Sequence, residues 1–250
     1  MNQQQILQIA LEQSAIDLSC TVEDLTCGKP RVVVSKNDPR ARKYLKLPHV
    51  CQIASYGQNV VASVREDLLD DVSRYVNTHK AHRCFETPQL LELNEILRPL
   101  GHETAWMDER FLPQLDQVQV ISSWLPLRVL GQKDFRDLYL PQWSNALSDS
   151  RPELDVIGVG AYDGDRLVGL AGASADCDTM YQIGIDVLPE YRHQGLAKAL
   201  TSHLTQEILA LGKVPFYTAA WSNIASVRNA IACGYRPCWV EVGTMPIHSR

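Results

Sequence analysis

The pattern of apolar and polar positions is clearest between residues 181 and 211. A short apolar run at 183–188 is followed by Pro189 and a polar turn, and leucine or isoleucine then recurs every three or four positions from Leu196 to Leu211. The run predicts a buried strand and the recurrence predicts an amphipathic helix. We therefore expect a strand, a turn and a helix in that order.

The first half of the chain shows the same two patterns in shorter pieces. Helical spacing occurs at 3–18, 65–76 and 88–97, and Thr87 is the expected N-cap of the last of these helices. Strand-like runs occur at 31–35, 50–54 and 59–64, and the last two are expected to form a hairpin. These elements predict a small α/β region.

The second half begins with less regular elements and then becomes strongly patterned. We expect strands at 118–124 and 127–130, a loosely helical stretch at 134–147, and a hairpin of 156–162 and 166–173 around Asp163-Gly164. After the central strand and helix come a strand at 214–220, a helix capped by Ser222 or Asn223, and a strand at 239–242. That helix is expected to turn Ile224, Val227 and Ile231 inward. The predicted class is α/β, a mixed twisted sheet flanked by helices.

Glycines are concentrated in the predicted hairpin, at positions 158, 160, 169 and 172. Glycine in a strand indicates the close approach of another backbone or of a ligand, or a strongly twisted sheet. The sequence leaves these explanations open.

Composition sets the number and type of domains. The 250 residues are 45% apolar and 21% charged, which is typical of a folded globular protein. At this length two domains are expected, and a composition change around residues 111–117 places the boundary so that they span 1–115 and 116–250. The net charge of -5 disfavours general affinity for phosphate backbones, so no nucleic-acid partner is expected.

Cysteine usage and the absence of apolar segments bear on location. The seven cysteines form no C-x-x-C pair, and an odd number would leave one unpaired in an oxidising compartment, so a cytoplasmic setting is expected. The N-terminal residues lack a basic region, and no segment approaches the roughly 18 apolar residues that cross a bilayer. We expect neither secretion nor membrane insertion.

One cluster carries metal-ligating residue types. His79, His82 and Cys84 follow the pattern His-x-x-His-x-Cys, but no second pair stands at zinc spacing. These residues are interpreted as part of a solvated loop, and no metal is expected.

The turn before the central helix carries the most specific chemistry. The first N–H groups of a helix have no partner within it and attract anions. Gly195 and Ala197 leave the backbone accessible there, and Arg192 adds a permanent positive charge. The turn therefore predicts a pyrophosphate site held mainly by main-chain donors. The residues expected at it are Arg192, His193, Gln194, Gly195, Leu196, Ala197 and Lys198.

These residues resemble the acetyl-CoA loop of the GNAT superfamily of N-acetyltransferases, whose pattern is Arg/Gln-x-x-Gly-x-Gly/Ala. Here the pattern reads Arg192-x-x-Gly195-x-Ala197, and the likeness extends upstream through Pro189 and downstream to Trp221-Ser-Asn-Ile-Ala-Ser and Cys233-Gly-Tyr235. It covers roughly residues 118–242. The resemblance implies a GNAT fold, acetyl-CoA as co-substrate, and acetyl transfer to a primary amine by direct attack.

The resemblance also implies further cofactor contacts. In the family the central strand diverges from its neighbour at its C-terminal end, where its main chain holds the pantetheine arm; here this end includes Ile185 and Val187. Asn223 and Ser226 match positions near the cofactor, although a helix cap is an equally good interpretation of Asn223. The acceptor stays unidentified, as does the role of residues 1–115, which would shape the pocket or form a homodimer interface.

One departure from the family pattern affects catalysis. Many members carry a tyrosine seven residues after that asparagine as general acid, and here the position is Ala230. Tyr217 is a candidate substitute, and candidates for the proton acceptor are Asp176, Asp178, Gln182 and Asp186. No catalytic residue is assigned. The alternative function is an inactive acyl-CoA-binding sensor or scaffold module; a Rossmann domain is disfavoured because no G-x-G-x-x-G follows a first strand.

Overall fold

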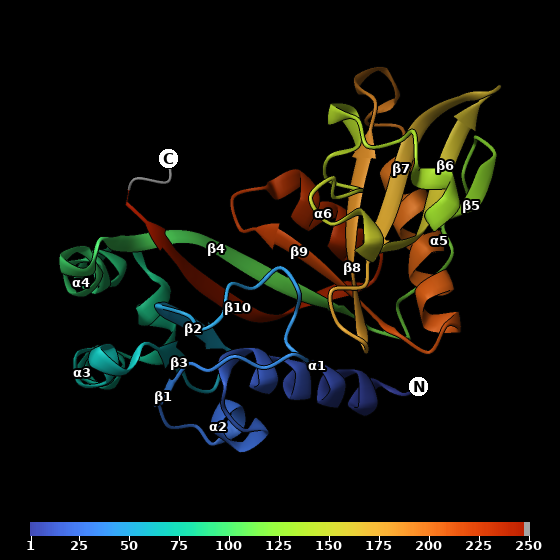
Figure 1. The fold of residues 1–250 in the computed structure, drawn as a ribbon. Coiled ribbons are helices and arrows are strands. Elements are labelled where there is room, and N and C mark those ends of the chain that lie inside the picture. Colours follow the sequence, from blue (N-terminus) through green and yellow to red (C-terminus); the bar gives the residue numbers. More distant parts are fainter. Residues whose placement is uncertain (248–250) are drawn as a thin grey trace. The chain divides into compact units, whose positions relative to one another are not determined.

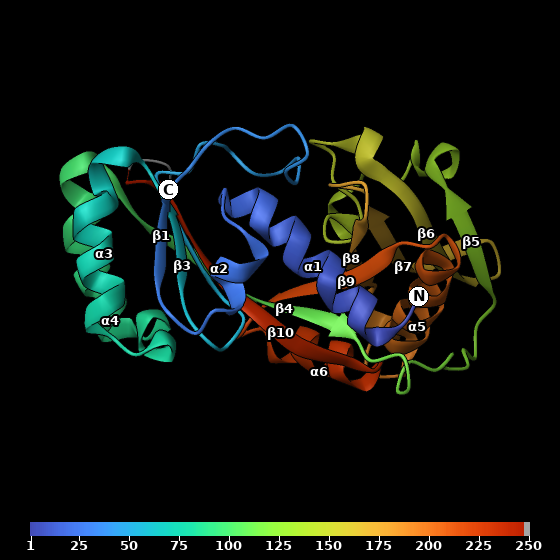
Figure 2. The same cartoon turned by 90° about the horizontal axis from the view of Figure 1, so that it is seen from below.

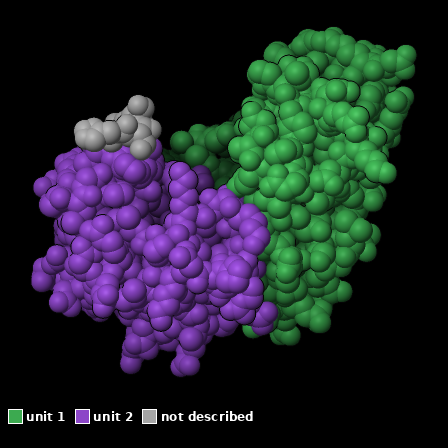
Figure 3. Space-filling model, in the orientation of Figure 1, with its two compact units in different colours: residues 1–9, 111–237 green, residues 10–110, 238–250 purple. Residues whose placement is uncertain are grey.

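The computed structural model describes residues 1–247 and divides them between two compact units (Figure 3). Unit 1 comprises residues 1–9 and 111–237. Unit 2 comprises residues 10–110 and, among the described residues, 238–247. The chain passes from one unit to the other within the first helix, between residues 9 and 10, and within the strands β4 (His102–Pro113) and β10 (Tyr235–Pro246). The last three residues of the predicted 116–250 domain lie outside the described residues.

Unit 2 is built on a mixed sheet with the strand order β1-β3-β2-β10-β4. β1 runs parallel to β3, and β2 runs antiparallel to both β3 and β10. The elements not yet bounded are α1 (Gln3–Leu18), whose first residues belong to unit 1, α2 (Val22–Thr26), β1 (Arg31–Val34), β2 (Cys51–Ser55), β3 (Val61–Val64), α3 (Leu69–Thr78) and α4 (Thr87–Leu97). Short 3-10 turns cover Glu66–Leu68, Ala81–Phe85 and Arg98–Leu100.

The β2–β3 hairpin shows why helices cover both faces of this sheet. Successive side chains of a strand point to opposite faces. Ile53 and Ala62, which are paired, pack with α3 and α4, whereas the neighbouring pair Ala54 and Val61 packs with α1 and α2 (Figure 2). The predicted hairpin is thereby confirmed. Every residue of β2 and β3 is buried, because α3 and α4 cover one face of the hairpin and α1 and α2 cover the other.

Unit 1 contains the strand order β9-β8-β7-β6-β5, in which all neighbours are antiparallel except the parallel pair β8 and β9 (Figure 1). The elements are β5 (Leu127–Gly131), β6 (Asp155–Asp163), β7 (Arg166–Ser174), β8 (Met180–Val187), α5 (Leu196–Ala210), β9 (Val214–Ala220) and α6 (Ile224–Ala232). Short 3-10 turns cover Gln132–Phe135, Pro141–Trp143, Pro152–Leu154 and Pro189–Tyr191. The predicted hairpin, central strand and central helix are confirmed, and so is the predicted α/β class.

Helix α5 packs on one face of β6, β7 and β8. Its recurring apolar side chains, Leu196, Leu200, Leu204 and Ile208, are buried in one cluster with side chains such as Val159, Ala171 and Ile183 from the strands. The leucine spacing that predicts this helix is thus the spacing of its buried stripe.

The opposite face of the sheet shows what the hairpin glycines accommodate. Gly158, Gly172 and Gly184 form a registered row across β6, β7 and β8. A Cβ at Gly172 would collide with the carbonyl group of Ala146, and one at Gly184 would collide with that of Asn145. A second stretch of backbone therefore lies directly on the sheet at Gly172 and Gly184, which explains Gly172 among the four hairpin glycines. Gly160 and Gly169 instead face side chains such as Leu167 and Leu200.

Several sequence predictions are wrong because tertiary partners decide them. Residues 118–124 form no strand; this extended stretch lies against α5, where the backbone N–H of Ile121 donates to Ser202 Oγ at 3.0 Å instead of to a neighbouring strand. Residues 134–147 contain only 3-10 turns, because Pro141 opens the second of these turns and Trp143 is drawn into a small apolar cluster. Conversely, the long strand β4 has no counterpart among the predicted elements.

Two local predictions about helix ends and faces are also corrected. Thr87 is the first residue of α4 and not its cap, a position taken by Glu86. In α6 only Val227 of the three expected inward residues is packed on the core, while Ile224 and Ile231 are 51% and 43% exposed. The helix instead turns Asn229 and Ala230 inward.

Among residues 1–247, no helix has both the length and the apolar character needed to span a bilayer.

Candidate functional site

The predicted phosphate turn has the backbone geometry of an open helix start. Gly195 is the N-cap of α5 and adopts the left-handed conformation with φ 83°, which glycine tolerates best. It offers no capping side chain, and the first helical bond is donated by the N–H of Ala199 to the carbonyl of Gly195 at 3.2 Å. The N–H groups of Leu196, Ala197 and Lys198 consequently have no acceptor within the helix.

Side chains tie this turn to the end of β8. Arg192 Nε donates to the carbonyl of Val187 at 2.8 Å, which uses one of the five guanidinium donors, and Gln194 Nε2 donates to the carbonyl of Glu190 at 3.3 Å. His193 also has a positive φ, 61°. The side chains of Arg192, His193, Gln194 and Lys198 are exposed, whereas Leu196 is buried in the core, so only its main chain is available to a ligand.

The parallel strands β8 and β9 separate next to this turn. Their pairing runs from Met180 and Val214 to Ile183 and Tyr217 and then stops, while β8 stays paired to β7 as far as Val187 (Figure 1). Residues 184–187 of β8 are therefore paired to β7 but not to β9. The pairing thus ends before Ile185 and Val187, and the cofactor contact expected at these two residues stays a prediction.

The start of α6 places two of the predicted residues in contact with structural partners. Asn223 Oδ1 accepts a hydrogen bond from the backbone N–H of Ser226 at 3.2 Å, so Asn223 caps the helix. Ser226 Oγ lies 2.9 Å from the hydroxyl of Tyr217. Tyr217 is the last residue of β9 paired to β8, and burial raises the pKa of its hydroxyl, which therefore stays protonated at neutral pH.

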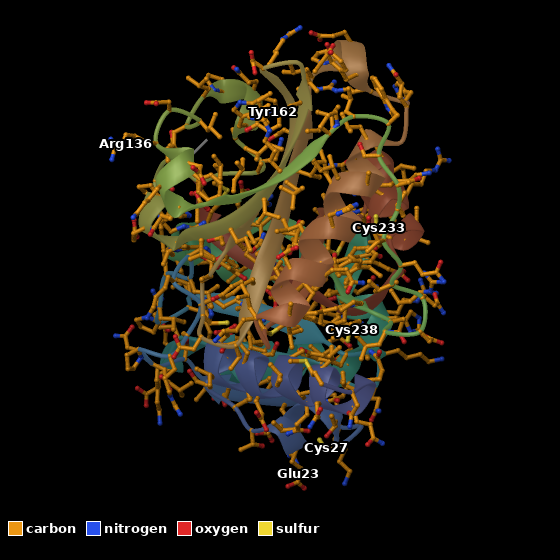
Figure 4. All side chains as sticks on the ribbon, turned by 90° about the vertical axis from the view of Figure 1, so that its right-hand side faces the viewer. Glu23, Cys27, Arg136, Tyr162, Cys233 and Cys238 are labelled. Atoms are coloured by element: carbon orange, nitrogen blue, oxygen red, sulfur yellow. The ribbon has the colours of Figure 1, made fainter. Side chains whose placement is uncertain are left out.

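Helix α6 packs by its second half against the first turns of α5, and Figure 4 shows Cys233 at this contact. Cys233 Sγ donates to the carbonyl of Lys198 at 3.5 Å, and Asn229 Nδ2 donates to Thr201 Oγ1 at 2.9 Å. Ala230 is fully buried here. Burial raises the pKa of the Cys233 thiol to about 12, so this sulfur is no nucleophile at neutral pH.

The four candidate proton acceptors have different surroundings. Asp186 accepts hydrogen bonds from the backbone N–H groups of Asn145 and Ala146, at 2.8 and 3.0 Å, and from Asn145 Nδ2 at 2.6 Å. Asp176 is 1% exposed and forms an ion pair with Arg151 at 3.5 Å. Asp178 is exposed in the turn before β8, and Gln182 is half-buried on that strand. None of them is assigned as the base.

Two further features lie in unit 2: the cluster of His79, His82 and Cys84, and a cavity. His79 Nε2 contacts Glu92 Oε2 at 2.8 Å and the Cys84 thiol is buried, and no group of three or more metal-ligating side chains occurs among residues 1–247. A cavity of about 470 Å³ lies between α3 and α4. Its carboxylates each have a basic partner: Asp67 pairs with Arg65, Asp71 with Arg74, Glu92 with His79 and Glu95 with Arg98.

Two features of the site are absent from the sequence predictions. The contact between Tyr217 and Ser226 joins a strand to the following helix, and the bonds of Asp186 reach residues about forty positions earlier in the chain. The row of glycines is the one sequence feature that indicates the second of these, because it marks where a backbone must approach the sheet.

Comparison with known proteins gives one family match. Residues 130–238 match the family model of GNAT acetyltransferases. No curated protein matches the sequence.

Solved structures of similar fold cover parts of the chain. A GNAT-family acetyltransferase from Colwellia psychrerythraea is 10% identical, covers 62% of this chain and 62% of its own, with a TM-score of 0.46. A GCN5-related N-acetyltransferase-like protein from Streptococcus suis is 18% identical, with coverages of 64% and 69% and a TM-score of 0.46. The protein yncA from Salmonella typhimurium, solved with its cofactor acetyl-CoA, is 15% identical, with coverages of 51% and 96% and a TM-score of 0.36.

The chain thus spans less than two thirds of the length of the Colwellia protein. In the present chain, β8, the turn at Gly195 and α5 all lie inside the segment that the family model matches. The chain therefore carries a GNAT acetyltransferase domain over residues 130–238.

Proposed function

We propose that this protein transfers an acetyl group from acetyl-CoA to a primary amine by direct attack. The observation that carries the proposal is the position of the open turn at Gly195 beside the point where β8 and β9 separate. Main-chain N–H groups of the first turn of α5 would bind the diphosphate. The pantetheine arm would then lie along residues 184–187 of β8, on the side toward β9, and bond to their main chain as a strand does.

The chemistry proposed for this site forms a C–N bond and breaks a C–S bond. The acceptor amine, largely protonated at neutral pH if its pKa is near 10.4, first loses a proton. Its nitrogen attacks the thioester carbonyl, coenzyme A leaves as a thiolate, and the nitrogen loses a second proton. Burial raises the pKa of Cys20, Cys51 and Cys238 to about 12, as it does for Cys233, which disfavours a covalent thiol intermediate on any of them.

Tyr217 is the hydroxyl that we infer protonates the departing thiolate. It stands where the strands separate and contacts Ser226, which is one helical turn from Ala230 on α6. The Tyr217 hydroxyl thus comes from β9, and it lies beside the face of α6 that carries Ala230, the position at which many GNAT members have a tyrosine. In this proposal Asn223 and Ser226 lie close to the cofactor, and Arg192 and Lys198 add positive charge around the diphosphate.

A second candidate function, an acyl-CoA-binding module without catalysis, is favoured by Ala230. Consumption of acetyl-CoA in the presence of a panel of primary amines separates the two functions. Tight binding of coenzyme A without transfer to any amine would favour the module.

The phosphate turn is tested by Gly195→Asp, with Gly164→Asp as its matched control. Both glycines have positive φ, 83° and 60°, and a Cβ at either would meet no atom within 4 Å, so the two variants carry similar strain. Only Gly195→Asp places bulk and negative charge against the diphosphate. We expect its affinity for coenzyme A, measured by calorimetry, to fall at least about tenfold, which is about 1.4 kcal/mol.

The control variant is expected to bind coenzyme A as the wild type does. Unchanged affinity in Gly195→Asp would remove the assignment of the turn. Absence of any heat of binding for the wild type at millimolar coenzyme A would overturn the proposed function itself.

A further inference from the structure

Charged side chains occupy part of the sheet face in unit 2 that α1 and α2 cover. The strand order places β10 between β2 and β4. Glu241 of β10 is paired to Ala54, which packs with α1 and α2, so Glu241 points to that same face. Arg110 of β4 donates to Glu241 Oε2 at 3.2 Å and is 3% exposed. A buried charged cluster therefore continues this face from β10 onto β4.

Carboxylates outnumber guanidinium groups in this cluster. Asp17 pairs with Arg42, Glu241 pairs with Arg110, and both ion pairs are buried. The third carboxylate is Asp108 of β4. Its ion pair with Arg110 is 3.9 Å long, and none of the described residues donates a hydrogen bond to it. The cluster thus carries one negative charge in excess, on Asp108.

The other titratable groups of the cluster do not supply a positive charge. Burial lowers the pKa of His49, so its imidazole is neutral at pH 7, and burial raises the pKa of the Tyr44 hydroxyl to about 12. Burial also raises the pKa of Asp108, although Arg110 acts in the opposite direction. A carboxylate partly removed from water is stabilised by a cation placed beside it.

An exposed indole ring lies next to this carboxylate. Trp106 precedes Asp108 by two residues on β4, so the two side chains point to the same face. The ring lies against Gly243 of β10, where a Cβ would come within 2.3 Å of it. The guanidinium carbon of Arg110 is 5.9 Å from the ring centroid, so the indole already contacts one buried cation. Trp106 is nonetheless 37% exposed, which leaves part of the ring open to solvent.

We propose that Asp108 and Trp106 form a binding site for a small organic cation, an alkylated ammonium group. The ammonium charge would compensate the carboxylate, and the alkyl groups would lie on the indole. An anion would be repelled by the three carboxylates of the cluster. The site lies wholly within unit 2, to which no sequence motif assigns a role, and it does not depend on acetyl transfer.

The probe that tests this site is tetramethylammonium, which has the charge and the alkyl groups but no N–H that could be acetylated. Its uncharged counterpart of similar size is tert-butanol. Binding to the full-length protein is measured by calorimetry and by tryptophan fluorescence in Asp108→Asn and Trp106→Leu. The matched controls are Glu109→Gln, between the two residues but on the opposite face of β4, and Trp124→Leu, whose indole is 55% exposed in unit 1.

We expect saturable binding of tetramethylammonium to the wild type at millimolar concentrations and no binding of tert-butanol. Asp108→Asn and Trp106→Leu should each weaken the affinity at least about fivefold, whereas the controls should stay within about twofold of the wild type. Circular dichroism checks folding. If Trp106→Leu does not fold, Asp108→Asn and the milder Trp106→Phe decide the question.

Three results would overturn the inference: no saturable binding of tetramethylammonium by the wild type, wild-type affinity in folded Asp108→Asn, or equal binding of tert-butanol. The proposed function is tested separately, because these measurements use neither acetyl-CoA nor an acceptor amine. A wild type that binds tetramethylammonium but does not consume acetyl-CoA would keep the cation site and lose the proposed function alone.

Discussion

At the scale of single residues, Tyr217 has the most consequential surroundings. Its ring is 2% exposed and lies against Phe111, with centroids 6.5 Å apart and planes at 89°. Its hydroxyl is 2.9 Å from Ser226 Oγ. Because burial raises the pKa of this hydroxyl, it remains a donor across the neutral range.

Tyr217→Phe removes only that hydroxyl and leaves the ring packing intact. We expect kcat for acetyl transfer to fall at least about tenfold with coenzyme A affinity nearly unchanged. The effect belongs at the low end of general acid catalysis, because a thiol of pKa about 8.5 already leaves readily. Steady-state kinetics check this, with Tyr162→Phe in the β6–β7 hairpin as control. A variant with full kcat would exclude Tyr217 as the donor.

The residues of the phosphate turn are largely readable from sequence. Gly195 stands at a helix start and needs positive φ, and both properties follow from the order strand, turn and helix. Leu196 has two separate roles, one for its main chain and one for its side chain, and the motif does not distinguish them. Its main-chain N–H faces the turn while its side chain belongs to the α5 core.

At the scale of elements, α6 begins with a cap that also lies close to the proposed cofactor. The bond from the backbone N–H of Ser226 to Asn223 Oδ1 satisfies one of the free donors of the helix start. The stability contribution of Asn223 and its proposed contact with coenzyme A are therefore separable by substitution.

Two substitutions at position 223 make this separation. Asn223→Ala should lower the free energy of unfolding by about 1 kcal/mol, and Asn223→Ser should restore most of it, because serine also caps. We expect coenzyme A affinity to fall in both variants, since neither presents the amide. Chemical denaturation and calorimetry measure the two effects. Full affinity in Asn223→Ser would show that the residue is a cap alone.

Elements with a strong local pattern are predicted well, and elements defined by partners are not. The leucine stripe of α5 and the turn of the β6–β7 hairpin depend on residues close in sequence. By contrast, residues 118–124 alternate as a strand does but pack along α5, and β4 carries charged residues at several positions and is nonetheless a long strand. A strand exists only where another strand offers hydrogen bonds.

At the scale of the whole molecule, each unit contains buried charged side chains that influence stability. In unit 2 Asp17 and Arg42 form a buried ion pair, and Arg110 pairs with Glu241 at 3.2 Å. In unit 1 Asp155 is 1% exposed, and burial, with a contribution from Asp176, raises its pKa to about 6. Removing one member of a buried pair leaves a charge without compensation, which is costly.

The raised pKa of Asp155 makes the stability of unit 1 dependent on pH. The carboxyl ionises at its ordinary value of 3.8 when unfolded and at about 6 when folded, so folding favours the protonated form. This contribution is fully present below about pH 4 and is lost as the pH rises through about 6. We expect Asp155→Asn to be more stable than the wild type at pH 7, by at most about 3 kcal/mol, with the gap closing toward pH 4.

Denaturant unfolding at pH 4, 5, 6 and 7 measures this gap. Asp165→Asn, at an exposed position, should differ from the wild type by the same small amount at every pH. A gap for Asp155→Asn that stays constant, or that widens toward low pH, would contradict the assignment.

The sequence by itself determined the strand, turn and helix that build the proposed phosphate site, because hydrophobic periodicity and glycine conformation act over a few neighbouring residues. The tertiary structure decided where β8 and β9 separate and which backbone lies on the glycine row. It also decided that Asp186 contacts Asn145 and that Tyr217 contacts Ser226. Each of these contacts joins different structural elements. No local pattern encodes them, since they arise only when the sheet and its covering segments pack together.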